Sequence, residues 1–365
     1  MFASAFPFSC TGVIELVISK QRRFNSVAAA AVLLLASGAA SADLAVLQYH
    51  HVSNETPAST STTPSLFRNQ IDMVQSLDID VKPLESATKE ALDGDLNESQ
   101  QVAITFDDAY SSVYTFAAPL LLEKGLPFTI FVNSQAIDDQ DRGSMTWEQL
   151  EELAGHPEVT IGNHSLDHGH LARKPNEADA QWHERVSHSL DASAARIEEK
   201  LGVTPTLFAY PYGEYDSELE KLIEDREWLA YGQQSGPIGA QSAKTRLPRF
   251  PMATSFGQLS SLKDKLMSKA LPVDAASLPD GIFKDNPPEL RFSLPANMPA
   301  KALSCYGSGV GRLVVKSDEA EGAVMVTADR AFDSRRFRYN CTYPAGDGRF
   351  YWQSVQWIDL SKPED

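Results

Sequence analysis

The segment Val102-Ala-Ile-Thr-Phe-Asp-Asp108 places two adjacent carboxylates directly after an apolar run of strand-forming residues. The run predicts a buried strand with Asp107 and Asp108 at its carboxyl end. Successive residues on a strand point to opposite sides, so the two carboxylates could serve different roles. One could bind a cation while the other holds or accepts a proton. The plainer alternative is a polar loop start with Asp108 as a helix N-cap.

The surrounding residues, 43–275, repeat the pattern of a short apolar run followed by a helical stretch. This alternation predicts a parallel sheet or barrel covered by helices, with the chemistry at the carboxyl ends of the strands. The predicted strands are Ala45–Tyr49, Val102–Phe106, Phe128–Val132, Val159–Gly162, Leu207–Tyr210 and Leu229–Tyr231. The predicted helices are Ser65–Leu77, Ser111–Lys124, Trp147–Ala154, Asn176–Lys200 and Asp216–Glu224.

Residues 281–365 show short β-rich runs and no helical period. The runs are Leu290–Leu294, Ala302–Tyr306, Leu313–Lys316, Ala323–Thr327, Phe337–Tyr343 and Phe350–Ile358. Gly346-Asp-Gly348 between the last two is typical of a hairpin turn. We therefore expect a small all-β sandwich as an accessory domain. Its aromatic residues could form a sugar-binding platform or, alternating along the strands, the sandwich core.

The N-terminus has the pattern of a secretory signal peptide, residues 1–42. Lys20, Arg22 and Arg23 precede the apolar run 27–36, and Ala40-Ser-Ala42 is a small-x-small cleavage site. Ten apolar residues are too few to cross about 30 Å of hydrocarbon, and no later segment is long enough. We expect an exported, periplasmic or secreted monomer with no integral membrane segment. The cysteines that would remain, Cys305 and Cys341, are then expected to form a disulfide.

Composition and charge exclude several classes of protein. A hydrophobic content of 42% excludes wholesale disorder. The 49 acidic against 32 basic residues give a formal net charge of −17, which argues against nucleic acid or an anionic membrane as a partner. Residues 281–365 hold 11 basic and 11 acidic residues, so the acid excess belongs to residues 43–280.

A second polar cluster, Asn163-His-Ser-Leu-Asp-His168, also follows a predicted strand. The i, i+4 spacing of His164 and His168 would place both imidazoles on one face of a helical turn, as two ligands of one metal ion. The alternative is a solvated histidine-rich loop. With Asp108 these histidines would make a set of two nitrogens and one carboxylate, which is typical of a catalytic metal site with open positions. Asp107 would stand beside it as a general base.

These motifs, followed by Phe208-Ala-Tyr-Pro-Tyr-Gly213, resemble those of the polysaccharide deacetylase family, carbohydrate esterase family 4, in order and spacing over residues 43–255. The resemblance implies a distorted (β/α) barrel, the NodB-homology domain, here over residues 43–280. It also implies a metal-dependent hydrolase of carbon–nitrogen bonds other than peptide bonds. Such an enzyme removes N-acetyl groups from N-acetylhexosamine polymers.

The resemblance also assigns roles to individual residues. Asp107 matches the catalytic base, and Asp108, His164 and His168 match the metal ligands. Tyr212 matches the position whose backbone N–H helps to form an oxyanion hole. The expected metal is Zn²⁺, with Co²⁺, Ni²⁺ or Fe²⁺ as alternatives.

Two positions depart from the family pattern. Ala209 stands where an arginine usually tethers the base, and Arg246 or Arg249 could replace that arginine. The segment Leu247–Met252 lacks the histidine that usually serves as the general acid. Tyr49-His-His51 instead resembles a branch with permuted motif order that includes exported poly-N-acetylglucosamine deacetylases. This resemblance makes His50 the expected acid, with His51 as second choice.

The leading hypothesis is therefore a deacetylase of poly-N-acetylglucosamine or a chitin-like polysaccharide, releasing acetate. Two alternatives stay open. The same site could cleave O-acetyl esters of a xylan-type polymer, or the protein could bind glycan without catalysis. The hypothesis of binding without catalysis rests on Ala209 and on the missing histidine in Leu247–Met252. The intact set of expected base and metal ligands argues against it.

Overall fold

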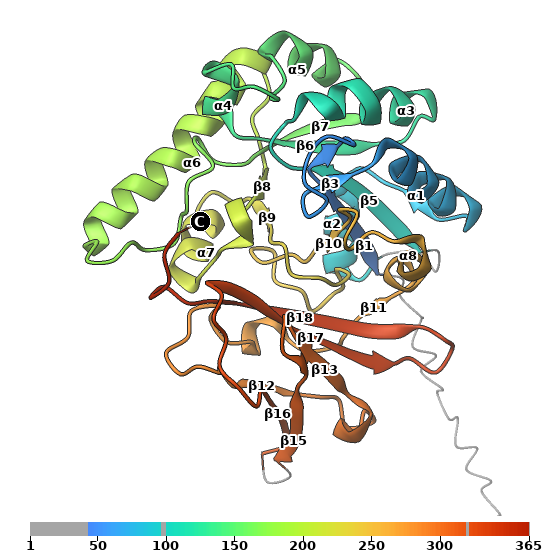
Figure 1. Cartoon of the computed structure of the whole chain (residues 1–365), viewed down its shortest axis with the longest axis vertical. Helices are drawn as coiled ribbons and strands as arrows, with labels where there is room; N and C mark the ends of the chain where they lie inside the picture. Colours follow the sequence, from blue (N-terminus) through green and yellow to red (C-terminus); the bar gives the residue numbers. More distant parts are fainter. Residues whose placement is uncertain (1–42, 96–99, 319–320, 365) are drawn as a thin grey trace, which may run out of the picture. The chain divides into compact units, whose positions relative to one another are not determined.

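The computed structural model describes residues 43–95, 100–318 and 321–364; the predicted signal peptide lies outside these ranges. Its central element is a parallel eight-stranded sheet in the order β10-β1-β5-β6-β7-β8-β9, with β4 also paired to β5 (Figure 1). The strands are β1 Leu44–Tyr49, β4 Asp80–Val81, β5 Gln101–Phe106, β6 Phe128–Val132, β7 Val159–Asn163, β8 Leu207–Ala209, β9 Leu229–Tyr231 and β10 Phe250–Pro251. All six strands predicted for this region are confirmed, within one residue at each end.

The sheet curls toward closure through the segment that ends in β10. Tyr231 of β9 forms a parallel bridge with Leu247, and β10 pairs with β1. Every residue of β1 and β5 is buried, as expected for parallel strands covered on both faces. The predicted distorted (β/α) barrel is confirmed.

Helices cover the outer side of this sheet: α2 packs on β1 and β5, α5 and α6 on β7, and α7 on β9. Thr63 caps α1 by accepting a hydrogen bond from Leu66, and Thr146 and Gln149 form a capping box at α5. The helices are α1 Pro64–Ser76, α2 Leu84–Asp93, α3 Ala118–Glu123, α4 Ser134–Asp138, α5 Trp147–Ala154, α6 Asp179–Leu201, α7 Ser217–Glu224 and α8 Leu259–Leu266. The predicted helix Ser111–Lys124 is a π-helical turn, Val113–Ala117, followed by α3. No helix among the described residues is both long and apolar enough to cross a lipid bilayer.

The C-terminal region consists of two sheets over a shared apolar core, and all their strand pairs are antiparallel except the parallel pair β11–β18. One, in the order β11-β18-β17-β13-β14, joins Lys269–Ala270, Phe350–Ile358, Arg336–Pro344, Ser304–Gly307 and Gly311–Arg312. The other, β12-β16-β15, joins Leu290–Ser293, Ala323–Thr327 and Val314–Asp318. Side chains from both sheets fill the core between them, and the expected small all-β region is confirmed.

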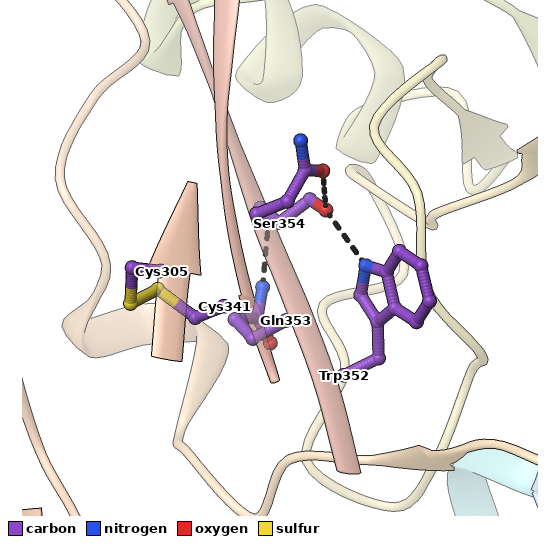
Figure 2. The surroundings of a disulfide bond; sticks show 6 residues. Cys305, Cys341, Trp352, Gln353 and Ser354 are labelled. Carbon is purple, nitrogen blue, oxygen red and sulfur yellow. Dashed lines mark hydrogen bonds between the residues drawn. A yellow bond between two sulfur atoms is a disulfide. The ribbon is translucent and has the colours of Figure 1, made fainter. Parts of the chain in front are cut away.

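The long strand β17 has two distinct faces, because its residues alternate between buried and half-buried. Phe337, Tyr339 and Cys341 enter the apolar core. Cys341 forms the predicted disulfide with Cys305 on the neighbouring strand (Figure 2). Most of the aromatic residues that sequence alone could not place therefore belong to the core rather than to a sugar platform.

The two regions contact each other extensively within the described chain, which forms one compact unit. Trp352 of β18 packs edge-on against Phe250 of β10, with ring centroids 5.4 Å apart. Strand β11, Lys269–Ala270, pairs with β18 of the C-terminal sheet, although it precedes the domain boundary expected at residue 280. That boundary stays a prediction.

Candidate active site

The residues expected to carry chemistry meet at the carboxyl ends of the parallel strands. Asp107 and Asp108 follow β5, His164 follows β7, and Tyr212 follows β8. His50 follows β1, and Arg249 immediately precedes β10. Backbone hydrogen bonds to neighbouring strands fix two of these residues just after the strand ends. Asp107 N donates to Tyr49 O at 2.9 Å, and His164 N donates to Val132 O at 2.9 Å.

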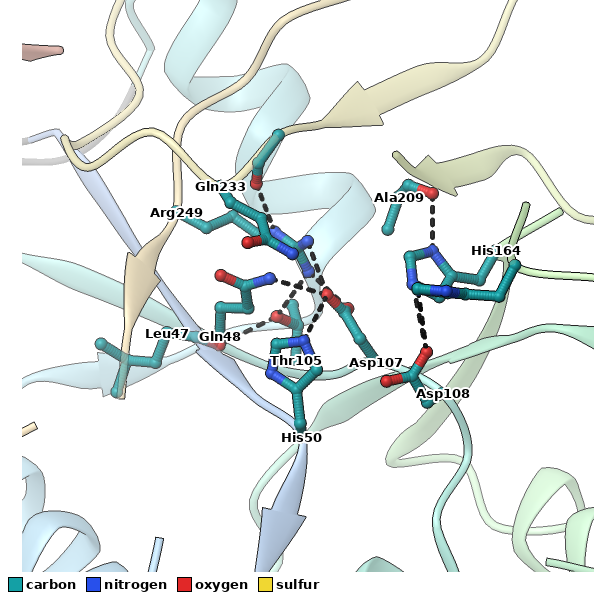
Figure 3. Close-up of polar contacts among 12 residues, drawn as sticks. Leu47, Gln48, His50, Thr105, Asp107, Asp108, His164, Ala209, Gln233 and Arg249 are labelled. Atoms are coloured by element: carbon teal, nitrogen blue, oxygen red, sulfur yellow. Dashed lines mark hydrogen bonds and ion pairs between the residues drawn. The ribbon is translucent and has the colours of Figure 1, made fainter. Parts of the chain in front are cut away.

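Asp107 is fully buried and held by three hydrogen bonds (Figure 3). Arg249 donates through Nη1 to Oδ1 at 2.7 Å and through Nη2 to Oδ2 at 2.8 Å, and Gln48 Nε2 donates to Oδ2 at 2.7 Å. Burial by itself raises the pKa of Asp107, but the charges of Arg249, His164 and His50 and the hydrogen bond from Arg249 together outweigh burial and lower the pKa to about 2. Arg249 therefore fills the tether role left open at Ala209, and Asp107 is ionised at neutral pH.

Asp108, His164 and His168 come together as a cluster that can hold a metal ion. Asp108 Oδ1 lies 3.4 Å from His164 Nε2 and 3.3 Å from His168 Nε2. His164 Nδ1 hydrogen-bonds to Ala209 O at 2.7 Å, which leaves Nε2 as the ligand atom. Burial and the charge of His164 lower the pKa of His168 to about 4, so its imidazole is neutral at pH 7.

The donor set fits a divalent metal ion by a direct structural criterion. Asp108 Oδ1 and His164 Nε2 are buried, and neither makes a hydrogen bond within the described part of the chain. Buried polar atoms are normally satisfied, so two converging lone-pair donors without hydrogen bonds indicate a position for a cation. Two imidazoles and one carboxylate are ligands that suit Zn²⁺ and similar ions.

The expected helical turn at His164–His168 is wrong. Residues 164–168 form an irregular loop, with Ser165 at φ 69° and His168 at φ 53°. Asn163 directs this loop, because its Oδ1 accepts a hydrogen bond from Ser165 N at 2.8 Å. The loop nevertheless brings both imidazoles to the same carboxylate.

The two candidate histidines for the general acid lie differently. His50 Nε2 is 3.9 Å from Asp107 Oδ2, its side chain is 20% exposed, and it lines the cleft (Figure 3). His51 stacks on Tyr110 with ring centroids 3.5 Å apart. The geometry therefore favours His50 over His51.

Tyr212 has a left-handed backbone, φ 58°, in the short turn Pro211–Gly213. His170 stacks on its ring at 3.9 Å, and the Arg336 guanidinium lies over the ring at 4.9 Å. A strained backbone at a functional position requires support from its surroundings. Here part of that support comes from the C-terminal region.

Glu214, two residues further on, anchors this turn to the C-terminal sheet. It is buried and accepts from Arg335 Nε at 2.8 Å, Arg336 Nη1 at 3.0 Å and His170 Nδ1 at 2.9 Å. Gln356 of β18 also donates to Gly213 O. The sequence did not predict roles for Glu214, Gln48 or the C-terminal arginines, although Gln48 stands two residues before His50.

A cleft of about 450 Å³ runs along this site. Its lining includes His50, Asp108, Tyr110, His168, Tyr212 and Gln233 from the barrel and Ser308, Arg336, Phe337 and Arg338 from the C-terminal region. The C-terminal region thus forms one wall of the cleft that contains the metal-ligand cluster.

The comparisons with known proteins agree with the motifs. Residues 95–227 match the family model described as polysaccharide deacetylase. The resemblance to that family is confirmed. A putative polysaccharide deacetylase of Bacillus subtilis is 29% identical over 123 residues, 34% of this chain and 40% of that protein. The chain thus spans less than half of this relative's length.

Two solved structures share the barrel fold. IcaB from Ammonifex degensii superposes with a TM-score of 0.53 at 23% identity, over 62% of this chain and 96% of that one. A de-N-acetylase from Aggregatibacter actinomycetemcomitans superposes with a TM-score of 0.53 at 18% identity, over 61% of this chain and 99% of that one. These likenesses show the fold. Each covers about the share of this chain that the barrel occupies.

Proposed function

We propose that this protein is a metal-dependent hydrolase that removes N-acetyl groups from an N-acetylhexosamine polysaccharide of the poly-N-acetylglucosamine or chitin type. The observation that carries the proposal is the placement of an ionised, doubly tethered Asp107 directly beside the Asp108–His164–His168 cluster. A purely structural carboxylate would not require three potential metal-ligand atoms gathered next to it. We also propose export to the periplasm or the exterior, with which the disulfide is compatible.

A divalent cation held by Asp108, His164 and His168 would polarise the acetyl carbonyl and lower the pKa of a water molecule. Asp107 would accept the proton of the attacking water, whose oxygen adds to the carbonyl carbon. The backbone N–H of Tyr212 would stabilise the negative charge on the carbonyl oxygen. As the carbon–nitrogen bond breaks, His50 would donate a proton to the leaving amine, and acetate would depart.

The test is an assay of the metal-loaded protein on two substrates. Purified protein is loaded with Zn²⁺, Co²⁺ or Ni²⁺ and given N-acetylglucosamine oligomers or acetylated xylan. Equal amounts of acetate and free amine from the oligomers support the deacetylase. Acetate from xylan alone would identify an O-acetyl esterase instead. Glycan binding with no acetate from either substrate would contradict both enzymatic assignments.

A further inference from the structure

The wall that the C-terminal region gives to the cleft is formed by one face of β17. Phe337 and Tyr339 point into the apolar core of that region, and the alternate residues Arg336 and Arg338 occupy the other face. Both arginines line the cleft together with His50, Asp108 and His168. The period of a β-strand therefore places two guanidinium groups beside the proposed reaction centre.

Arg338 differs from the other half-buried and buried arginines in the charge around it. Its one side-chain hydrogen bond is from Nη2 to Gln233 Oε1, at 3.4 Å, and no described carboxylate pairs with it. Burial, and then the charge of Arg336, lower its pKa to about 10. The comparable arginines all have acidic partners: Arg185 with Glu177, Arg246 with Glu220, Arg249 with Asp107 and Arg335 with Glu214.

A partly buried cation without a counter-charge is costly, because it has lost hydration without gaining an ionic partner. Arg336 does not relieve this cost, since it is itself a cation. Its own partner Glu214 is shared with Arg335 and His170. The charge of Arg338 therefore has no described carboxylate to balance it at this end of the cleft, in a chain whose net charge is −17.

Another side of the metal-ligand cluster has the reverse polarity. A second depression of about 270 Å³ there shares Asp108 and His168 with the main cleft and is also lined by Asp139, Asp141 and Asp167. An anionic group on a ligand would be repelled from that side and attracted to β17. The polarity would therefore orient an asymmetric, charged ligand along the site.

We propose that Arg338, assisted by Arg336, forms a carboxylate-binding subsite, so that the substrate is an acidic N-acetylated glycan. The carboxylate would be carried by the acetylated sugar itself or by its neighbour in the chain. The inference rests on the proposed deacetylase function and changes its substrate class, because poly-N-acetylglucosamine and chitin carry no carboxylate. The overall negative charge disfavours a polyanion at long range, but a guanidinium–carboxylate contact acts at short range and is little screened.

The experiment compares kcat/KM on three sets of substrates with the full-length, metal-loaded protein. They are neutral N-acetylglucosamine oligomers, oligomers alternating N-acetylglucosamine with a uronic acid, and peptide-free glycan strands whose N-acetylated sugar carries a lactyl carboxylate. The second and third distinguish a neighbouring carboxylate from one on the acetylated sugar. Each acidic glycan is also tested after its carboxylates are reduced to alcohols. We expect at least one acidic glycan to exceed both its reduced form and the neutral oligomer by about 10- to 100-fold.

Variants of Arg338 test whether this residue causes the preference for acidic glycans. Arg338→Met should bring the ratio of kcat/KM on the acidic glycan to kcat/KM on the neutral oligomer close to one, and Arg338→Lys should retain part of the preference. Arg312→Met, an exposed change in the same sheet, is the charge-matched control and should change neither rate. If Arg338→Met does not fold, the comparison of native and reduced glycans on the unaltered protein still shows whether the protein prefers a substrate with a carboxylate.

Two results would overturn the subsite. One is equal turnover of acidic, reduced and neutral glycans by the unaltered protein. The other is that Arg338→Met is no longer inhibited by free acetate but keeps the substrate preference of the unaltered protein. This result would mean that Arg338 contacts the product. Absence of acetate from every glycan would instead contradict the proposed function itself.

Discussion

Arg249 and Asp107, 142 residues apart in the sequence, form a two-point ion pair in which both side chains are fully buried. The planar guanidinium matches both carboxylate oxygens, so the pair fixes the orientation of Asp107 as well as its charge. The tether arises from the segment that joins β9 to β10, rather than from the strand end at Ala209. The barrel thus keeps the arrangement of charge while taking the arginine from a different part of the chain.

Arg249→Met should inactivate the protein and destabilise it. Removing one partner leaves the Asp107 carboxylate buried without its counter-charge, which costs roughly 3–5 kcal/mol of unfolding free energy. The double change Arg249→Met with Asp107→Asn should recover part of that stability and none of the activity. Chemical denaturation and acetate release measure the two effects.

Arg246→Met is the matched control for this prediction, because Arg246 lies in the same segment but is paired with Glu220 instead of Asp107. It should lower stability but leave turnover per folded molecule nearly unchanged. Equal losses of turnover in the two single variants would show that Arg249 has no specific connection with the base.

Removal of metal should abolish activity, and added Zn²⁺ should restore it. His164→Gln should bind at least tenfold less metal than the unaltered protein, because it removes one of three ligands and the bond to Ala209 O. Metal content after gel filtration and calorimetric titration with Zn²⁺ report this independently of turnover. His183→Gln, a histidine of helix α6 outside the cluster, should bind metal normally. Undiminished Zn²⁺ binding by His164→Gln would place the metal elsewhere.

Glu214→Gln should loosen the connection between the Tyr212 turn and β17. Burial raises the pKa of Glu214, but hydrogen bonds from His170 and Arg335 and the charge of Arg335 lower it to about 2. A folded-state pKa below the unfolded value near 4.5 means that the ionised group stabilises the fold above pH 4.5. This contribution is lost as the pH falls from about 4.5 to about 2.

The variant should therefore be less stable than the unaltered protein at pH 7, by roughly 3 kcal/mol, and should approach it in stability near pH 2. Thermal unfolding across pH 2–7 checks both statements. Glu151→Gln, an exposed change on α5, should follow the unaltered protein throughout. A stability difference that stays constant over the whole pH range would show that the Glu214 charge is not the cause.

His50→Ala should reduce turnover by about 10²–10⁴-fold, the range for loss of a general acid. His51→Ala is the natural control, since this neighbour stacks on Tyr110 and lies outside the lining of the main cleft. We expect its effect on kcat to be much smaller. Full turnover by His50→Ala on N-acetylglucosamine oligomers would assign the acid to another group.

The sequence was sufficient for six strands of the barrel because each is a short, largely apolar run, such as Phe128–Val132. The two-residue strands β4 and β10 were not predicted. Short helices such as Leu259–Leu266, with few apolar residues, had no comparable signal. The histidine motif predicted the residues of the cluster but not the loop, since the shape of the loop depends on the Asn163 side chain and two left-handed residues. The choice between Arg246 and Arg249 depends on contacts more than 20 and 140 residues distant, which no local pattern records.

The contribution of the C-terminal region to the cleft could not be predicted from the sequence, because it also depends on contacts between distant residues. Alternation along Phe337–Tyr343 correctly predicted a strand, but it could not say what the face opposite the core would contact. Only the packing of β17 against the barrel turns Arg336 and Arg338 into residues of the cleft. The aromatic residues were equally ambiguous until the two sheets were seen to enclose them.

The most direct test of the central claim is the rate of acetate and amine release from an N-acetylated glycan by Asp107→Asn. The change preserves size and leaves Asp108, His164 and His168 intact, so the variant should bind Zn²⁺ like the unaltered protein. We predict a loss of turnover of at least about 10²-fold, the range for removal of a general base, with both products falling together. Turnover close to that of the unaltered protein, with the metal bound, would contradict the assignment of Asp107 as the proton acceptor.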